Sequence, residues 1–346
     1  MIYYLDVALT QSGIDWANQV PIPTSMTKAE YDALPDKTVF VRDGYTIDLS
    51  EGTSTGFAYE DIVGRTVNQI RGLFPDENGD YDHTYARVHV AGAGDFTVIG
   101  SSAGEDLYGG TGNDTLYDGG NAGFEYEHDG LHGGAGDDTY YITGVDSSVT
   151  EKAGEGFDRV YADGFFQLYP DSEVEFVKIS GEYAQAFGNN LANIMVGSDQ
   201  PSIIAGEGGN DTLRSDGADT VFEGGVGNDA MRGGAGVDVF LYYGKEDGRD
   251  TISRFGKEDV LVTTSKIADA NGDNIITFGS NKALDFTATS SVRITDDTGA
   301  TVKALEYDGA FTDGGTTYYV YSRVGSSAGV DSALGSGLVT YYAQYQ

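Results

Sequence analysis

Aspartates follow glycine pairs at a fixed distance along this chain, in a period of nine residues. The stretch GGVGNDAMRGGAGVDVF, from Gly224 to Phe240, places Asp229 and Asp238 five residues after the first glycine of each pair. If successive periods stack, like charges lie about one strand spacing (~4.8 Å) apart, which is unfavourable unless something neutralises them. Carboxylates and turn carbonyls offer only oxygen, which is the ligand that Ca²⁺ prefers. The spacing therefore predicts bound Ca²⁺ in the turns.

Tight turns must alternate with very short strands to hold these aspartates in place. Glycine adopts positive φ without strain, so repeated glycines predict repeated tight turns. The triplets 230–232 and 239–241 that follow the two turns have an apolar central residue, as a minimal strand does. Three strand residues per turn bury too little to fold alone, so the copies must stack into a solenoid.

The copies fall into two blocks. In the first block, residues 109–117 and 133–141 are full copies, and the 15 residues between them equal one period plus a six-residue insertion. The second block contains residues 206–214, a damaged copy at 215–223, and the copies at 224–232 and 233–241. Residues 142–199 break the pattern and read as β-rich.

The nonapeptide GGxGxDxUx, in which U is a large apolar residue, resembles the repeat of RTX (hemolysin-type) calcium-binding proteins. Residues 149–160 (VTEKAGEGFDRV) are similar to segments that follow such blocks, and residues 188–195 (GNNLANIM) resemble degenerate repeats that precede one. The resemblance covers roughly residues 96–256. It implies an all-β fold, the parallel β-roll, in which two nonapeptides make one coil and each ion lies between stacked turns.

The resemblance also implies the ligands. Asp211, Asp229 and Asp247 are spaced by 18 residues and would line one edge. One ion would take Asp211 and Asp229 with carbonyls of Glu207, Gly209, Gly224 and Val226, and a second would take Asp229 and Asp247 with Gly225, Gly227, Tyr242 and Gly244. On the opposite edge, Asp238 with Gly233 and Ala235 would face the damaged copy, which has Thr220 at the sixth position and Asp219 one place earlier. In the first block, Asp114 and Asp138 would share an ion with Gly110, Gly112, Gly133 and Ala135.

The composition fits a chain that depends on cations. The 346 residues include 55 acidic and 20 basic residues, a net charge of −35, which argues against binding nucleic acid or an anionic membrane. Hydrophobic residues make up 39%, which argues against permanent disorder. Cysteine is absent, and no apolar run is long enough for a transmembrane helix.

The remaining sequence suggests five regions. Residues 1–95 are mixed but mostly β, with strands expected at 38–41, 45–49 and 86–90 and a short helix after the capping box from Thr27 to Glu30. Residues 96–160 and 200–256 form the two repeat blocks, 161–199 a β-rich spacer, and 257–346 a β-rich C-terminal region. The neutral tail 323–346 fits the uncleaved signal by which RTX proteins leave through a type I secretion channel.

Other motifs carry weaker chemistry. The loops Asp269–Asp273 and Asp76–Asp82 are acidic enough for Ca²⁺ but fit solvated turns as well. GxSxG occurs around Ser102 and Ser327, in a chain with 51 glycines. No HExxH motif occurs, so no zinc protease of that type is encoded, and His128 and His132 are expected in a surface loop.

The sequence thus predicts a secreted, non-enzymatic, calcium-folded structural protein at the cell surface or in the matrix, which assembles into homo-oligomers or arrays. The alternatives are a calcium-dependent adhesin or carbohydrate-binding module that takes a cell-surface glycan, and the accessory region of an enzyme. We expect that the protein does not bind nucleic acid and does not span a membrane.

Overall fold

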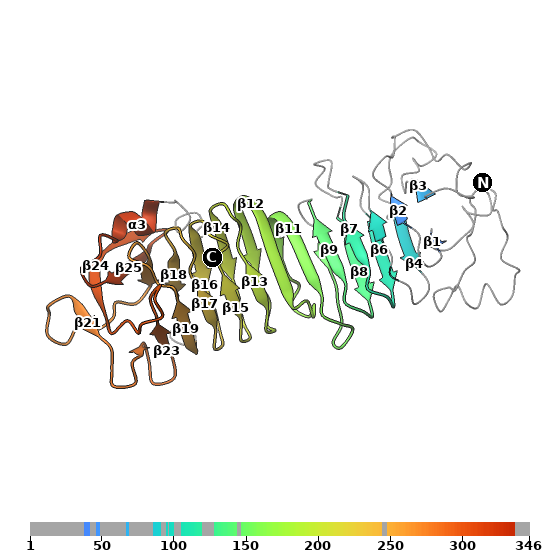
Figure 1. Ribbon diagram of the computed structural model, residues 1–346. Coiled ribbons are helices and arrows are strands. Elements are labelled where there is room, and N and C mark those ends of the chain that lie inside the picture. The colour runs from blue at the N-terminus through green and yellow to red at the C-terminus, as the bar shows by residue number, and fades with distance from the viewer. Residues whose placement is uncertain are drawn as a thin grey trace, which may run out of the picture. The chain divides into compact units, whose positions relative to one another are not determined.

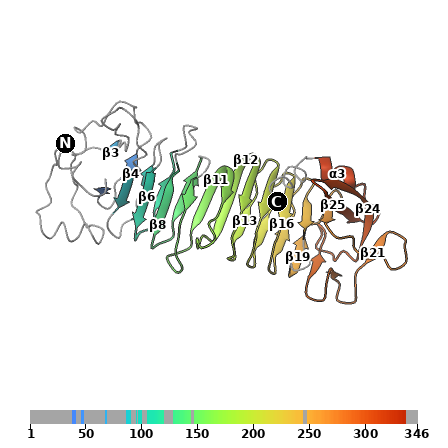
Figure 2. The ribbon, with the colours of Figure 1, turned by 180° about the vertical axis from the view of Figure 1, so that it is seen from behind.

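The computed structural model confirms an all-β, parallel solenoid fold (Figures 1 and 2). It describes residues 38–41, 46–48, 67–68, 86–90, 95, 97–99, 105–119, 128–143, 147–243 and 248–335. The chain forms two compact units, unit 1 (residues 1–162 with 171–174) and unit 2 (residues 163–170 with 175–346). No helix within the described ranges is long and apolar enough to cross a membrane.

Unit 1 consists of two parallel ladders. The first runs β1 (Thr38–Val41), β4 (Ala86–Val90), β6 (Glu105–Gly110), β8 (Gly130–Gly134) and β10 (Ser148–Val149). The second runs β3 (Val67–Asn68), β2 (Thr46–Asp48), β5 (Thr97–Ile99), β7 (Thr115–Tyr117), β9 (Thr139–Ile142) and β11 (Arg159–Gln167). The strands expected at 38–41, 45–49 and 86–90 are confirmed, and the capping box at 27–30 lies outside the described residues.

Unit 2 repeats this plan. Its first ladder runs β12 (Phe176–Phe187), β14 (Ser202–Ala205), β16 (Thr220–Glu223), β18 (Val239–Tyr242) and β20 (Val260–Thr263). Its second ladder runs β12, β13 (Ile194–Val196), β15 (Thr212–Arg214), β17 (Ala230–Arg232), β19 (Arg249–Ser253) and β23 (Ser291–Ile294). Residues 161–199, expected as a spacer, therefore supply strands that extend the stack of the second block.

The three-residue strands bury one apolar side chain each. Leu116 of β7 and Leu213 of β15 are 0% exposed, and Met231 of β17 is 1% exposed. Full burial of one such side chain contributes only about 1.5–3 kcal/mol, which does not offset the conformational entropy lost when a single strand is ordered. The strands persist because each pairs with equivalent strands in the neighbouring coils.

Antiparallel strands and one helix complete unit 2. β25 (Thr316–Arg323) pairs with β20, and β24 (Ala304–Asp313) pairs with both β25 and β21 (Ile275–Thr277). β22 (Leu284–Asp285) pairs with β23. The helix α3 (Val330–Gly335) lies where a β-rich tail was expected, and residues 336–346 of the expected secretion signal lie outside the described residues.

β25 and α3 cover one face of the first ladder of unit 2. Neighbouring residues in a strand point to opposite faces, and both Val221 and Phe222 of β16 are 0% exposed. The second buried face is a cluster in which Ile203, Val221, Val239 and Val260 pack with Tyr318, Val320 and Ala333. β25 and α3 thus shield strands that a bare solenoid would expose to water (Figure 1).

Candidate metal centre

One row of acidic side chains runs along the turns of unit 2. The amide of Asn193 donates to Asp211 Oδ1 at 2.7 Å, the amide of Asp211 to Asp229 Oδ1 at 2.8 Å, and the amide of Asp229 to Asp250 Oδ1 at 2.9 Å. The three aspartates are at most 3% exposed. Each carboxylate therefore sits one coil from the next, inside the protein, as the nonapeptide spacing predicts for Asp211 and Asp229.

Unit 1 carries an equivalent row. The amide of Asp114 donates to Asp138 Oδ1 at 2.6 Å, and the amide of Asp138 donates to Asp158 Oδ1 at 2.8 Å. All three side chains are at most 1% exposed. Asp114 and Asp138 lie in neighbouring coils, as expected from their 24-residue spacing, because Thr115 pairs with Thr139.

A third row lies along the other ladder of unit 2. The amide of Thr220 donates to Asp238 Oδ1 at 3.1 Å, so Asp238 faces the damaged copy as expected, and the amide of Asp238 donates to Asp259 Oδ1 at 3.0 Å. Both second oxygens in this row also accept hydrogen bonds, from Gly234 N and Gly256 N at 2.6 Å. The third row is thus more fully hydrogen-bonded than the other two.

The first glycine of each repeat makes room for the carboxylate of its own turn. A Cβ atom at Gly133 would overlap Asp138 Oδ2, and one at Gly206 would overlap Asp211 Oδ2. Both Oδ2 atoms are buried and accept no hydrogen bond from any described residue. A buried carboxylate oxygen without a donor is a high-energy arrangement unless a proton or a cation satisfies it.

The turn carbonyls predicted as ligands lie between consecutive coils. Gly110 O accepts a hydrogen bond from Ala135 N at 3.0 Å, Glu207 O from Val226 N at 2.8 Å, and Val226 O from Gly209 N at 2.9 Å. Glycines of the following coil leave room for such carbonyl oxygens. A Cβ atom at any of four glycines would overlap a carbonyl oxygen of the preceding coil: Gly134 that of Gly110, Gly136 that of Gly112, Gly225 that of Glu207 and Gly227 that of Gly209. Gly224 O and Gly133 O face Gly206 and Gly109 in the same way. The carbonyl oxygens predicted as metal ligands therefore lie between neighbouring turns, at Gly110, Gly112, Glu207, Gly209 and Val226.

Burial dominates the electrostatics of these rows. Removal from water, together with repulsion from the carboxylates of Asp114 and Asp158, raises the pKa of Asp138 to about 7. Burial likewise raises the pKa of Asp211 to about 8 and that of Asp238 to about 8, with added repulsion from Asp229 and Asp259 respectively. Without a cation, these carboxyls hold protons near neutral pH.

The structure corrects the second predicted ion site of unit 2. β17 pairs with β19 so that Ala230 lies beside Thr251, and the coil contains 21 residues, which makes Asp250 rather than Asp247 the next member of the row. Tyr242 is not a turn residue, because it ends β18 and its carbonyl accepts a hydrogen bond from Thr264 N. Gly244 and Asp247 lie outside the described residues.

The opposite-edge set is altered as well. Gly233 lies against Asp238 and Asp259, since a Cβ atom there would come within 2.8 Å and 3.4 Å of their Oδ2 atoms. Ala235 is exposed and Asp219 accepts a hydrogen bond from Val237 N at 2.8 Å. The partner of Asp238 in this row is Asp259, which does not belong to a nonapeptide copy.

Four buried acidic residues in or beside the rows do not match the nonapeptide motif: Glu151, Asp158, Asp250 and Asp259. Their coils lack the glycine pair, so the nonapeptide pattern does not select them. A weaker signal was present, because Asp158, Asp250 and Asp259 each precede by two residues an apolar residue that is at most 1% exposed. An aspartate followed two residues later by an apolar residue therefore identifies the row aspartates better than the glycine pairs do.

The remaining motifs have ordinary environments where they are described. Asp269 Oδ1 and Oδ2 accept hydrogen bonds from amides of Asn271, Gly272 and Asn274 within their exposed loop. Ser327 donates to the carboxylate of Glu258 at 3.1 Å. His132 lies in β8, stacked on Tyr108 with 4.4 Å between ring centroids, rather than in a loop. Asp76–Asp82 and Ser102 lie outside the described residues.

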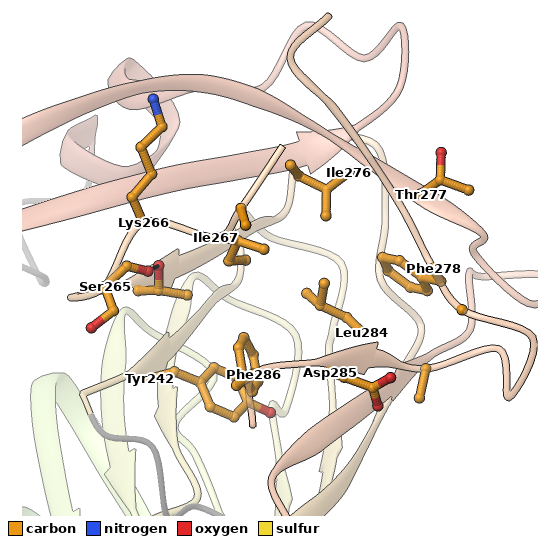
Figure 3. A pocket seen from close by; sticks show the side chains of 14 residues that line it. Tyr242, Ser265, Lys266, Ile267, Ile276, Thr277, Phe278, Leu284, Asp285 and Phe286 are labelled. Carbon is orange, nitrogen blue, oxygen red and sulfur yellow. Dashed lines mark hydrogen bonds between the residues drawn. The ribbon is translucent and has the colours of Figure 1, made fainter. Parts of the chain in front are cut away.

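Unit 2 also contains a pocket of about 480 Å³ among β18, β20, β21 and β22. Figure 3 shows Phe286 packed on Tyr242, with Ile267, Leu284 and Phe278 along the walls. Lys266 places its Nζ over the Tyr307 ring at 4.1 Å, and Asp285 accepts hydrogen bonds from Asn281. The lining mixes apolar and aromatic side chains with the polar groups of Thr263, Ser265, Lys266, Thr277 and Asp285, which suits a small polar ligand better than a metal ion.

No protein-family model matches the chain, and no curated protein and no solved structure shows detectable similarity to it.

Proposed function

We propose that this protein is an extracellular calcium-binding structural protein, similar to RTX (hemolysin-type) repeat proteins, that folds when Ca²⁺ occupies its turns. The observation that supports this proposal is the stacking of buried carboxylates one coil apart, in which the second oxygens of Asp138 and Asp211 accept no hydrogen bond from any described residue. A buried carboxylate that stays ionised costs several kcal/mol unless a cation neutralises it, so bound Ca²⁺ would stabilise the stacked turns.

The donors select the kind of ion. The rows offer carboxylate and carbonyl oxygens and contain neither histidine nor cysteine, which disfavours zinc and copper. Asp211 and Asp229 with the carbonyls of Glu207, Gly209, Gly224 and Val226 would hold one ion in unit 2, and Asp114 and Asp138 with Gly110, Gly112, Gly133 and Ala135 one in unit 1. The ion would supply the positive charge, and the chain would supply the carboxylate and carbonyl oxygens that coordinate it.

Circular dichroism at pH 8 tests the proposal. In chelator the chain should lose most of its β signal, because deprotonated carboxylates repel across every coil. Addition of Ca²⁺ should restore the signal with a midpoint of about 10⁻⁴–10⁻³ M, the range of many extracellular sites. Mg²⁺ at the same concentration is the control and should restore much less. A native β signal in chelator at pH 8 would show that the proposal is wrong.

Self-assembly forms part of the proposal. At a net charge of −35 the metal-free protein repels its own copies, and Ca²⁺ removes part of that repulsion while it orders the strands. We expect homo-oligomers or arrays at millimolar Ca²⁺ that dissolve in chelator, detected by sedimentation, and we expect the protein in the culture medium or on the cell surface. A compact monomer at high Ca²⁺ and high protein concentration would contradict assembly.

The pocket of unit 2 favours a second candidate function, a calcium-dependent adhesin or carbohydrate-binding module. Its aromatic wall of Tyr242, Phe278 and Phe286 beside the polar groups of Ser265 and Asp285 is the lining that small polar ligands with an apolar face require. Saturable binding of a cell-surface glycan by the monomer would support this candidate over assembly.

A further inference from the structure

Three buried carboxylates converge in unit 1, one from the last full nonapeptide of the first block and two from the segment that follows it. Asp138, Glu151 and Asp158 each place an oxygen within 4.8 Å of the others, and the three side chains are at most 1% exposed. Glu151 belongs to the segment 149–160, which contains no glycine pair, so it reaches the row of Asp138 and Asp158 from outside the repeat.

The carboxylates of Asp138 and Glu151 are held by their first oxygens. Asp138 Oδ1 accepts the amide of Asp114, and Glu151 Oε1 accepts both the Tyr140 hydroxyl and the Gly133 amide, the latter at 3.0 Å. The second oxygens, Asp138 Oδ2 and Glu151 Oε2, are buried and accept no hydrogen bond from any residue the structure describes. Two fixed carboxylates thus retain an oxygen each for a ligand.

The neighbouring lysine does not neutralise this cluster. Lys152 follows Glu151 directly, but its side chain is 81% exposed and its Nζ lies 3.7 Å from Glu155 at the surface. Ser172 accepts a hydrogen bond from the Glu151 amide at 3.1 Å, which fixes the backbone rather than the carboxylate. Neither Lys152 nor Ser172 neutralises the carboxylates of Asp138 and Glu151, so protons or a cation from solution must do so.

From this convergence we infer a calcium site formed by Asp138, Glu151 and Asp158, separate in composition from the turn sites, which closes the end of the first repeat block. It deepens the proposed function and rests on the same premise, that buried carboxylates of this chain bind Ca²⁺. Oxygens within 4.8 Å of one another are compatible with one ion at the about 2.3–2.6 Å typical of Ca²⁺. Mg²⁺ fits less well, because it retains several waters and demands octahedral geometry that a dry site does not offer.

Glu151→Gln tests the site, because glutamine has the shape of a protonated glutamic acid but cannot supply a charge. We expect equilibrium dialysis at saturating Ca²⁺ to find one ion fewer in Glu151→Gln than in the wild type. At saturating Ca²⁺ the same variant should unfold at a lower denaturant concentration than the wild type, because one stabilising ion has been lost. Glu155→Gln, four residues away and 24% exposed in its side chain, is the matched control and should match the wild type in both measurements.

The outcomes separate this inference from the proposed function. If the wild type binds several ions and Glu151→Gln binds as many, Glu151 is a protonated structural residue and the inference is wrong, while the proposed function stands. If the chain folds in chelator but binds one ion that Glu151→Gln loses, the inference stands and the proposed function fails. If the wild type binds no Ca²⁺, both fail.

A second variant covers the case in which Glu151→Gln does not fold. Tyr140→Phe keeps the buried ring but removes the hydroxyl that donates to Glu151. Loss of such a supporting hydrogen bond should weaken one ion about tenfold and leave the number of ions unchanged. Equal affinity for every ion in Tyr140→Phe and the wild type would overturn the site.

Discussion

Without divalent cations, the protein should become less stable as the pH is raised from about 5 to about 9, and the stabilisation by Ca²⁺ should grow over the same range. Burial raises the pKa of Asp138 to about 7, of Asp211 to about 8 and of Asp238 to about 8 in the folded, metal-free chain. In the unfolded chain an aspartate has a pKa near 3.9, so the folded state holds protons that the unfolded state has released.

The direction of the effect follows from this difference. A carboxyl whose folded pKa is raised contributes fully to stability below its unfolded pKa, and the contribution is lost as the pH rises through the folded pKa. One pKa unit corresponds to about 1.4 kcal/mol, so three such groups together should change the free energy of unfolding by at least several kcal/mol. Calcium takes the place of the protons and binds only the ionised carboxylates, so its effect has the opposite dependence on pH.

Denaturant unfolding measures both curves, in chelator at pH 5, 6 and 7, where the buried carboxyls still hold protons, and with Ca²⁺ at pH 5, 7 and 9. Asp238→Asn should flatten the metal-free curve, since it fixes one group in a form that resembles the protonated acid. Asp199→Asn removes the same charge from an exposed position of unit 2 and is the control that should leave the slope unchanged. Metal-free stability that rises with pH would exclude buried, protonated carboxyls in these rows.

Asp250→Ala should raise the Ca²⁺ concentration required for folding much more than Asp247→Ala. Asp250 is 3% exposed and its Oδ1 accepts the amide of Asp229 at 2.9 Å, so it continues the row of Asp211 and Asp229. Removal of this carboxylate would take a ligand from the proposed ion beside Asp229 and would leave the buried Asp229 amide without its acceptor. We expect a shift in the calcium midpoint on the order of tenfold or more.

Asp247→Ala is the matched comparison because the 18-residue spacing assigns the row position to Asp247. Calcium titrations followed by circular dichroism compare both variants with the wild type under the same buffer. Equal shifts, or a larger shift for Asp247→Ala, would show that the 21-residue coil is not the functional register of this part of the solenoid.

The sequence alone predicted the features that depend on local chemistry. Glycines at turn positions, one apolar residue per strand triplet and one aspartate per period are fixed within nine residues. They were enough to predict the solenoid, and the resemblance to RTX repeats implied that Asp211 neighbours Asp229 and that Asp114 neighbours Asp138 across an insertion. Where a copy is complete, the turn has only one way to stack on the copy before it, because each glycine fits over a carbonyl of that copy.

Only the tertiary structure decided what happens where copies are incomplete. The coil from Asp229 to Asp250 contains 21 residues and that from Asp138 to Asp158 contains 20, so a fixed period selects the wrong aspartate or none. Strand pairing keeps the apolar residues Met231 and Ile252 in register although 21 residues separate them. The register is then set by burial in the ladder and not by distance along the chain.

The approach of Glu151 to Asp138 and Asp158, and the cover that β25 and α3 place over Val221 and Val239, also depend on the tertiary structure. In sequence, Glu151 is one acidic residue among 55, and the outward valines look like ordinary strand residues. Their roles arise from contacts between segments many residues apart, and such contacts form only once the coils have stacked. A nine-residue pattern specifies the turn and its carboxylate, whereas the partners of that carboxylate are chosen by the packing of the whole unit.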